Sequence, residues 1–195
     1  MSEINKDCMD VIFNEARTHK YFENKPISDE LFVQLYDILK LAPTFANCQA
    51  GRFVFVKSPE AKARLIPYLD PSNVSKVEAA SATVIVAGDA EFYKNMPRLF
   101  PHGDYMSFFA SNAAFADRTM YQNSSFQGAY LIIAARALGL DCGPMGGFDN
   151  AGVDKEFFPD GKWKSNFLCN LGTGIPSKLH PRDPRLNFNE ACKII

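Results

Sequence analysis

The stretch from Gly139 to Asp149 constrains the fold most, because it follows a long apolar helical run and holds four glycines and a proline. Gly139 can end the helix, since glycine tolerates the left-handed conformation of a helix C-cap. The glycines at 143, 146 and 147 have no side chains, so a flat or charged ligand can approach bare peptide N–H groups there. The pattern indicates backbone shaped for a cofactor, and a tight turn between helix and strand is the alternative.

Hydrophobic periodicity and turn residues predict a helix-rich α+β domain over residues 1–195. Helices are expected at residues 8–16, from Ser28 to before Pro43, from Pro59 to about Tyr68, and from about Asn112 to Leu138, with Ser28 and Ser58 as N-caps. Strands are expected at residues 52–57, 82–87 and 167–171. The continuous apolar run at 82–87 is typical of a central strand covered on both faces.

Two parts of the sequence suggest contact with a partner. The long helix has one apolar face that includes Phe126 and Tyr130, yet Leu131 and Leu138 make the opposite face apolar as well. A helix that is apolar all round is buried, often between subunits. The tail that begins at Pro176 is rich in prolines and basic residues and cannot form a core alone. We therefore expect it to pack on another surface, such as a partner chain.

The composition argues against several classes of protein. The net charge is −1 with acidic and basic residues interleaved, which disfavours a nucleic-acid surface. Residues 1–7 carry no signal-peptide pattern, and the longest uncharged apolar stretch, residues 128–135, is too short to span a bilayer. The five cysteines are scattered without a Cys-x-x-Cys pair, so neither a disulfide framework nor a metal site is expected. We expect a cytoplasmic, reduced protein.

The sequence leaves several interpretations open for the residues that could carry chemistry. No Gly-x-Ser-x-Gly elbow supports nucleophilic hydrolysis, and no strand is followed by the Gly-x-Gly-x-x-Gly of a dinucleotide-binding fold. His102 is a ligand, a general acid or an ordinary loop histidine. Several cations are solvated surface charges unless the fold brings them together on a phosphate group: Arg17, Lys20, Lys76, Arg182 and Arg185.

Short segments in order along the whole chain resemble those of the FMN-dependent nitroreductase superfamily. They are Arg17-Thr18-His19 before Phe22 and Pro26, Pro43 to Gln49 leading into Arg52-Phe53-Val54, the pair Asn73 and Lys76, Gly143 to Asp149, and Pro184-Arg185. The sequence is most similar to the reductases assigned to malonic semialdehyde in pyrimidine utilisation, whose most distinctive segment here is Phe100-Pro101-His102-Gly103-Asp104. Two segments depart from the family pattern: Gln49-Ala50-Gly51 lacks the usual Pro-Trp, and Asp183-Pro184-Arg185 lacks the usual lysine.

The resemblance implies a nitroreductase-like fold, with a central mixed β-sheet flanked by long helices in an interlocked homodimer that exchanges C-terminal tails. It also implies two FMN molecules at the interface. The residues that would hold FMN are Arg17, Thr18, His19, Asn73, Lys76, Pro144, Met145, Gly146, Gly147 and Arg185, with Thr44, Phe45 and Asn47 from the partner chain. Arg17, Lys76 and Arg185 would bind the phosphate, and Thr18, His19 and Asn73 the phosphate, ribityl chain or ring edge. Pro144 to Gly147 would lie against the ring, with the Gly146 N–H aimed at flavin N5.

The reaction implied is ping-pong: NADH or NADPH gives a hydride to flavin N5 and leaves, and a small-molecule acceptor then takes it. We expect the acceptor to be malonic semialdehyde, reduced to 3-hydroxypropionate in uracil degradation. The alternatives are a broad-specificity nitro, quinone or enone reductase, and a flavin-binding module without turnover. An aldehyde acceptor needs a proton or a hydrogen-bond donor for its developing alkoxide. His102 is the candidate for that role; otherwise it lies in a mere lid loop.

Overall fold

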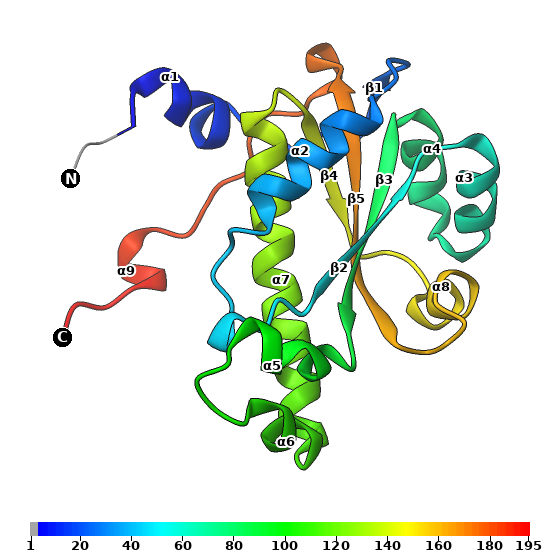
Figure 1. Cartoon of the computed structure of the whole chain (residues 1–195). Helices are drawn as coiled ribbons and strands as arrows, with labels where there is room; N and C mark the ends of the chain where they lie inside the picture. The colour runs from blue at the N-terminus through cyan, green and yellow to red at the C-terminus, as the bar shows by residue number, and fades with distance from the viewer. Residues whose placement is uncertain (1–3) are drawn as a thin grey trace.

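A computed structural model describes residues 4–195 and shows a five-stranded sheet between two layers of helices (Figure 1). The strands are β1 (Phe22–Glu23), β2 (Gly51–Val56), β3 (Ala82–Asp89), β4 (Asp141–Met145) and β5 (Trp163–Gly174). Helices α2 (Asp29–Leu39) and α7 (Ala113–Ala137) cover one face, and α3 (Pro59–Leu65), α4 (Pro71–Ala79) and α8 (Asn150–Phe157) cover the other. The expected α+β class is confirmed.

Shorter helical segments complete the chain. They are α1 (Lys6–Met9), α5 (Met96–Leu99), α6 (Tyr105–Ala110) and α9 (Phe188–Ala191), a π-helical turn η1 (Asp10–Asn14), and the 3₁₀ turns η2 (Phe45–Asn47), η3 (Ile66–Tyr68), η4 (Phe92–Asn95) and η5 (Pro176–Lys178). The segments η4, α5 and α6 form a lobe against the N-terminal part of α7, packed around Phe92, Met96 and Phe109. Among residues 4–195, none of the helices is long and apolar enough to cross a membrane.

Strand β3 accounts for the layered arrangement. All its residues are buried. Val84 and Val86 pack in the core with α2 and α7, whereas Ile85 and Ala87 pack in the core with α3, α4 and α8. Because successive strand residues point to opposite faces, a strand covered on both sides has a continuous apolar sequence. The prediction for residues 82–87 is therefore confirmed.

The sheet is antiparallel. Its order is β1-β5-β3-β2, and β4 also pairs with β5. The expectation of a mixed sheet is wrong for residues 4–195, in which the single parallel contact is an isolated bridge between Thr18 and Cys142. The reason is that helical connections return the chain at the end where the previous strand stopped. Val56 at the end of β2, for example, lies opposite Thr83 at the start of β3.

Local sequence signals identify several helix ends correctly. The Ser28 hydroxyl accepts a hydrogen bond from the Leu31 N–H at 3.3 Å, and the Ser58 hydroxyl accepts one from the Ala61 N–H at 3.1 Å. Both predicted N-caps are confirmed, because each side chain satisfies an N–H that the first helical turn leaves free. The helix expected at 8–16 is instead two short pieces, α1 and η1, that end at Asn14.

The glycine-rich stretch is more regular than a turn. Residues 141–145 form β4, which pairs with β5 so that Met145 lies opposite Leu168. The turn between helix and strand is limited to Leu138 and Gly139, whose φ is 79°, and Gly146 and Gly147 follow β4 as irregular backbone. β4 has β5 as its only strand partner in the described sheet, and such an edge position tolerates a proline like Pro144.

Two apolar or extended surfaces are left uncovered within one chain. α7 buries Leu131 and Ala135 against the sheet, but Phe126 and Tyr130 on its other side are exposed. Residues 180–195 are all exposed, and the tail ends beyond α9, which stands away from the rest of the chain (Figure 1). Its own chain thus buries only one side of the helix that the sequence analysis describes as apolar all round.

Leu65 provides a test of the core on the α3 side of the sheet. The side chain is fully buried in a cluster with Val77 and Leu168. We expect Leu65→Ala to lower the free energy of unfolding by about 2–5 kcal/mol, because it removes apolar contacts and leaves a cavity. Urea unfolding followed by circular dichroism measures the change, and a loss below about 1 kcal/mol would mean that this cluster does not hold the layer together.

Candidate functional site

The segment Arg17–His19 is held against the start of β4. Thr18 forms a parallel bridge with Cys142, and the His19 N–H donates to the Cys142 carbonyl at 2.9 Å. A Cβ atom at Gly143 would lie 2.4 Å from the His19 carbonyl oxygen, far inside van der Waals contact. Glycine at 143 therefore permits the close backbone approach that fixes Arg17 and Thr18 beside β4.

The side chain of His19 belongs to the scaffold. It is buried, and its Nε2 lies 3.4 Å from Asp141 Oδ1. Its ring occupies the space that a Cβ at Gly174 would need, with Nδ1 only 2.0 Å from that position. The imidazole thus lies beside Asp141 of β4 and Gly174 of β5, and it is not among the lining residues of the basic pocket described next.

A basic pocket of about 460 Å³ lies between the N-terminal segment, the end of α7 and the C-terminal tail. Its polar lining residues are Arg17, Thr18, Lys20, Arg136, Lys178, His180, Arg182, Asp183 and Arg185. Arg17 and Arg185, which the sequence analysis assigned to a phosphate, do converge. The lining includes six cationic side chains and one carboxylate, so the pocket attracts an anion. Lys76, the third expected phosphate contact, is not among the lining residues.

Arginine side chains also join the two ends of the chain. Arg17 Nη2 donates to the His180 carbonyl at 2.6 Å, and Arg182 Nη2 donates to the carbonyls of Asn14 and Ala16 at 2.6 and 3.0 Å. A guanidinium has five N–H donors, so Arg17 keeps donors for a ligand while it anchors the tail. These bonds hold the tail against residues 14–17, and they form the wall of the pocket.

Arg136 is a site residue that the sequence analysis missed. It lies in the last turn of α7, donates from Nη1 to the Ile12 carbonyl at 3.1 Å and lines the basic pocket. Within residues 4–195 its Nε is the buried side-chain polar atom left without a hydrogen-bond partner. A buried donor without an acceptor is unfavourable, and no group in residues 4–195 satisfies this one. The available sequence signal is that this cation ends the apolar run 128–135.

The far end of β4 meets α4. Asn73 Nδ2 donates to the Gly147 carbonyl at 2.8 Å, and Lys76 Nζ donates to Asn73 Oδ1 at 2.7 Å. A Cβ at Gly147 would lie 2.4 Å from Asp70 Oδ2, whereas a Cβ at Gly146 would meet nothing within 4 Å. The structure therefore groups Asn73, Lys76 and Gly147, and leaves open space beside the exposed Gly146 backbone.

The third expected group lies elsewhere in the chain. Thr44 and Phe45 line an apolar hollow of about 340 Å³ with the exposed side of α7, including Phe126 and Tyr130. Asn47 Nδ2 donates to the Leu99 carbonyl at 2.9 Å, which ties this segment to α5. Within one chain these residues do not line the basic pocket.

The buried thiols near these segments are not activated. Burial raises the pKa of Cys48 to about 11, and the pKa of Cys169 is also raised, by its hydrogen bond with Cys142 and by burial. A raised pKa keeps each sulfur protonated at neutral pH, and the thiolate is the nucleophilic form. Cys48 and Cys169 therefore act as packing residues.

The chain is similar to known proteins in both sequence and structure. The model of the nitroreductase family matches residues 14–173. Two curated relatives are each provisionally named NADH dehydrogenase/NAD(P)H nitroreductase. The one from Ralstonia nicotianae is 52% identical over the full length of both chains, and the one from Rhodopseudomonas palustris is 55% identical over 96% of this chain and 95% of its own. A nitroreductase-like protein from Exiguobacterium sibiricum, solved with FMN, superimposes over 100% of both chains with a TM-score of 0.87 and 22% identity.

The close approach at Gly143 can be tested with a matched pair of variants. We expect Gly143→Ala to destabilise the ligand-free protein by about 1–3 kcal/mol, because the new methyl group meets a backbone oxygen that cannot rotate away. Gly146→Ala, which adds the same methyl group in open space, should change stability by less than about 0.5 kcal/mol. Thermal unfolding of both variants measures the difference. Equal stability of the two would show that Gly143 does not control the spacing between His19 and β4.

Proposed function

Because the chain belongs to the nitroreductase family, we propose that it is an FMN-dependent oxidoreductase that uses NADH or NADPH as electron donor. The observation that carries the proposal is the convergence of Arg17, Arg136 and Arg185 on one pocket. A phosphate monoester carries nearly two negative charges and several acceptor oxygens at neutral pH. The pocket provides charged N–H donors that match such a group.

The residues around β4 fit the rest of the cofactor. In this arrangement Arg17, Arg136 and Arg185 hold the phosphate, and Thr18 offers a hydroxyl beside them. At the other end of β4, the open Gly146 backbone faces the ring, and Asn73 keeps the Gly147 carbonyl in place. Lys76 orients Asn73 and does not join the phosphate pocket. When bound, FMN supplies the hydride chemistry that transfers electrons from NAD(P)H to an acceptor.

The site is completed in this proposal by a second copy of the chain. Thr44, Phe45 and Asn47 lie outside the basic pocket of their own subunit, and in this proposal they would reach the flavin of the partner. Three surfaces support a homodimer with exchanged tails: the exposed side of α7, the exposed tail beyond Arg185, and the edge of β2 that no strand within residues 4–195 covers. Exposed apolar side chains and an unpaired strand edge are surfaces that a partner chain covers.

The substrate proposed first is malonic semialdehyde, reduced to 3-hydroxypropionate as a step of pyrimidine degradation. Asp104 caps α6 by accepting the Ser107 N–H at 3.0 Å, and this hydrogen bond lowers the pKa of Asp104. His102 is exposed just before it, with its ring centre 5.1 Å from that of Phe100. Phe100 contacts Tyr105, whose ring centre lies 6.0 Å from that of Phe45. The loop that carries His102 is thus connected to the segment that reaches the partner's flavin.

A broad-specificity nitro, quinone or enone reductase is the second candidate. It is favoured by the names of the curated relatives. A flavin-binding module without turnover is the third candidate, which steady oxidation of NADH or NADPH with an added acceptor would exclude.

Cofactor binding is tested first. The purified protein should show flavin absorption and release FMN at about one molecule per chain on heating. Arg17→Ala and Arg136→Ala should each raise the Kd for FMN roughly tenfold or more, because each removes charged hydrogen bonds to the phosphate. Arg64→Ala is the control, since Arg64 pairs with Glu156 on the opposite helical layer. A colourless wild-type protein that also fails to bind added FMN would contradict the proposal.

Substrate choice is tested by comparing kcat/KM for malonic semialdehyde with that for a nitroaromatic compound. The first candidate predicts a clear preference for the aldehyde, and the second predicts the reverse or no preference. If His102 serves the aldehyde, His102→Ala should lower its kcat/KM by roughly 10²-fold. FMN binding and nitroaromatic reduction should stay unchanged. An unchanged rate of aldehyde reduction would place His102 in a lid loop without a chemical role.

A further inference from the structure

The segment between α2 and β2 has an unusual backbone. Ala46, Asn47 and Gln49 have φ angles of 44°, 54° and 43°, and they are the non-glycine residues of positive φ in residues 4–195. Residues with a Cβ rarely adopt this left-handed conformation, although asparagine does so more readily than others. Such strained backbone persists only where surrounding contacts impose it.

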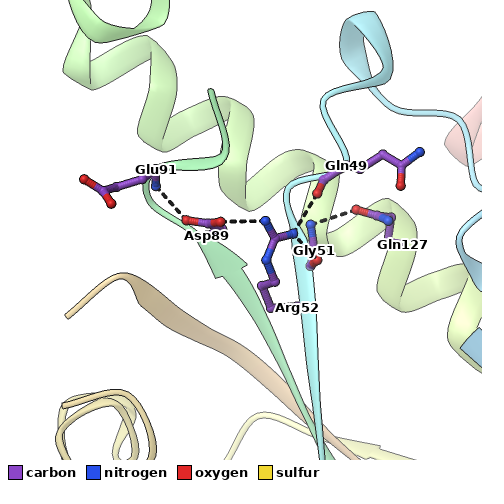
Figure 2. A network of polar contacts seen from close by, with 6 residues as sticks. All are labelled: Gln49, Gly51, Arg52, Asp89, Glu91 and Gln127. Carbon is purple, nitrogen blue, oxygen red and sulfur yellow. Dashed lines mark hydrogen bonds and ion pairs between the residues drawn. The ribbon is translucent and has the colours of Figure 1, made fainter. Parts of the chain in front are cut away.

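Arg52 imposes part of this conformation. Figure 2 shows its guanidinium at the centre of a polar network at the start of β2. One nitrogen, Nη1, donates to the carbonyls of Gln49 and Gly51 at 2.9 and 2.8 Å. These bonds draw the Gln49 carbonyl toward β2, at the point where the left-handed segment ends. Arg52 thus fixes the C-terminal end of the strained segment through the Gln49 carbonyl.

The guanidinium is itself held from two further directions. Arg52 Nη2 lies 2.5 Å from Asp89 Oδ2, and Asp89 Oδ1 accepts the Glu91 N–H at 2.8 Å. The Trp163 ring centre lies 5.9 Å from the Arg52 Cζ, within range of a cation–π contact. The side chains of Arg52 and Asp89 are 22% and 12% exposed, so solvent screens this pair less than a surface pair. Arg52 therefore has a single well-defined position.

Helix α7 holds the same segment from the other side. Asn123 Oδ1 accepts the Phe45 N–H at 2.8 Å, and Gln127 Oε1 accepts the Gly51 N–H at 2.7 Å (Figure 2 shows the second of these). Both side chains are buried in α7. Residues 45–51 are thus fixed at one side by a helix and at the other by Arg52.

We propose that Arg52 is a positioning residue for the flavin site of the partner subunit. It acts through segment 46–49, whose residues other than Cys48 are left-handed. This segment sets the direction of Thr44, Phe45 and Asn47. The inference rests on the proposed FMN-dependent homodimer, and it extends that proposal to a residue outside the expected flavin contacts. In this arrangement Arg52 touches neither cofactor nor substrate. It pre-organises a segment that would otherwise become ordered only on binding, and the cost of that ordering would weaken affinity.

The experiment compares Arg52→Lys with Arg64→Lys in the full-length protein. Lysine keeps the charge opposite Asp89 but lacks the planar fork that reaches two carbonyls together. Arg64 is a matched control, because it also contacts a carboxylate, a main-chain carbonyl and an aromatic ring, namely those of Glu156 and Phe157. The readouts are the Kd for FMN by fluorescence, and hydrogen exchange of the amides of residues 45–51 in the FMN-free protein.

We expect Arg52→Lys to raise the Kd for FMN about tenfold and to speed exchange across residues 45–51, whereas Arg64→Lys should change neither. Arg52 accepts no hydrogen bond from those amides. Their faster exchange would therefore report greater mobility of the segment and not the loss of a direct hydrogen bond. Unchanged exchange, or faster exchange with an unchanged Kd, would overturn the role of Arg52. Failure of the wild-type protein to bind FMN would instead overturn the proposed function on which the inference rests.

A second variant keeps the test independent of any general loss of stability. Ala46→Gly keeps the Gln49 carbonyl that Arg52 binds and removes no side-chain hydrogen bond, and glycine adopts a φ near 44° without strain. The melting temperature should therefore not fall, although the segment gains freedom. A weaker Kd for FMN at an unchanged or higher melting temperature supports the proposal. An unchanged Kd together with faster exchange shows that pre-organisation of this segment does not serve the cofactor.

Discussion

The contact between the backbone of Thr18–His19 and strand β4 determines where the candidate site forms. It needs a glycine at 143, because any side chain there would meet the His19 carbonyl. With this contact in place, Arg17 stands at the start of β4, while Gly146 and Gly147 stand just past its end, next to α4. One short strand thus separates an anion-binding pocket from an open stretch of peptide backbone. A ligand with a phosphate at one end and a flat ring at the other matches both ends of β4.

The arginines of the pocket have two tasks that depend on one geometry. Arg17 and Arg182 donate to carbonyls across the N-terminal and C-terminal segments, so they build the wall of the pocket. The same guanidinium groups, with Arg136 and Arg185, give the pocket its charge. Like charges so close together repel one another in the absence of an anion. An anion in the pocket would therefore relieve this repulsion, and its binding would be coupled to the docking of the tail.

The sequence predicts those features that depend on neighbouring residues and fails where distant segments meet. Ser28 and Ser58 are recognisable N-caps, because the cap and the N–H it satisfies lie three residues apart. The family motifs likewise identify Arg17 and Arg185. By contrast, the burial of the His19 ring depends on Asp141 and Gly174, and the contribution of Arg136 depends on where α7 ends relative to the tail. No local pattern encodes these distances, since the chain brings the segments together only on folding.

The strained segment 46–49 supports the proposal that part of the site comes from a second chain. Left-handed backbone at Ala46 and Gln49 is unfavourable by roughly 1–3 kcal/mol for each residue. Yet the contacts with Asn123, Gln127 and Arg52 maintain it. In one subunit this ordered segment lies at the surface: Phe45 is exposed, and it borders the uncovered side of α7. Order maintained at an exposed surface is useful only if that surface meets something of fixed shape. A second copy with its flavin satisfies this condition, because the uncovered side of α7 and the ordered segment would be covered by the same contact.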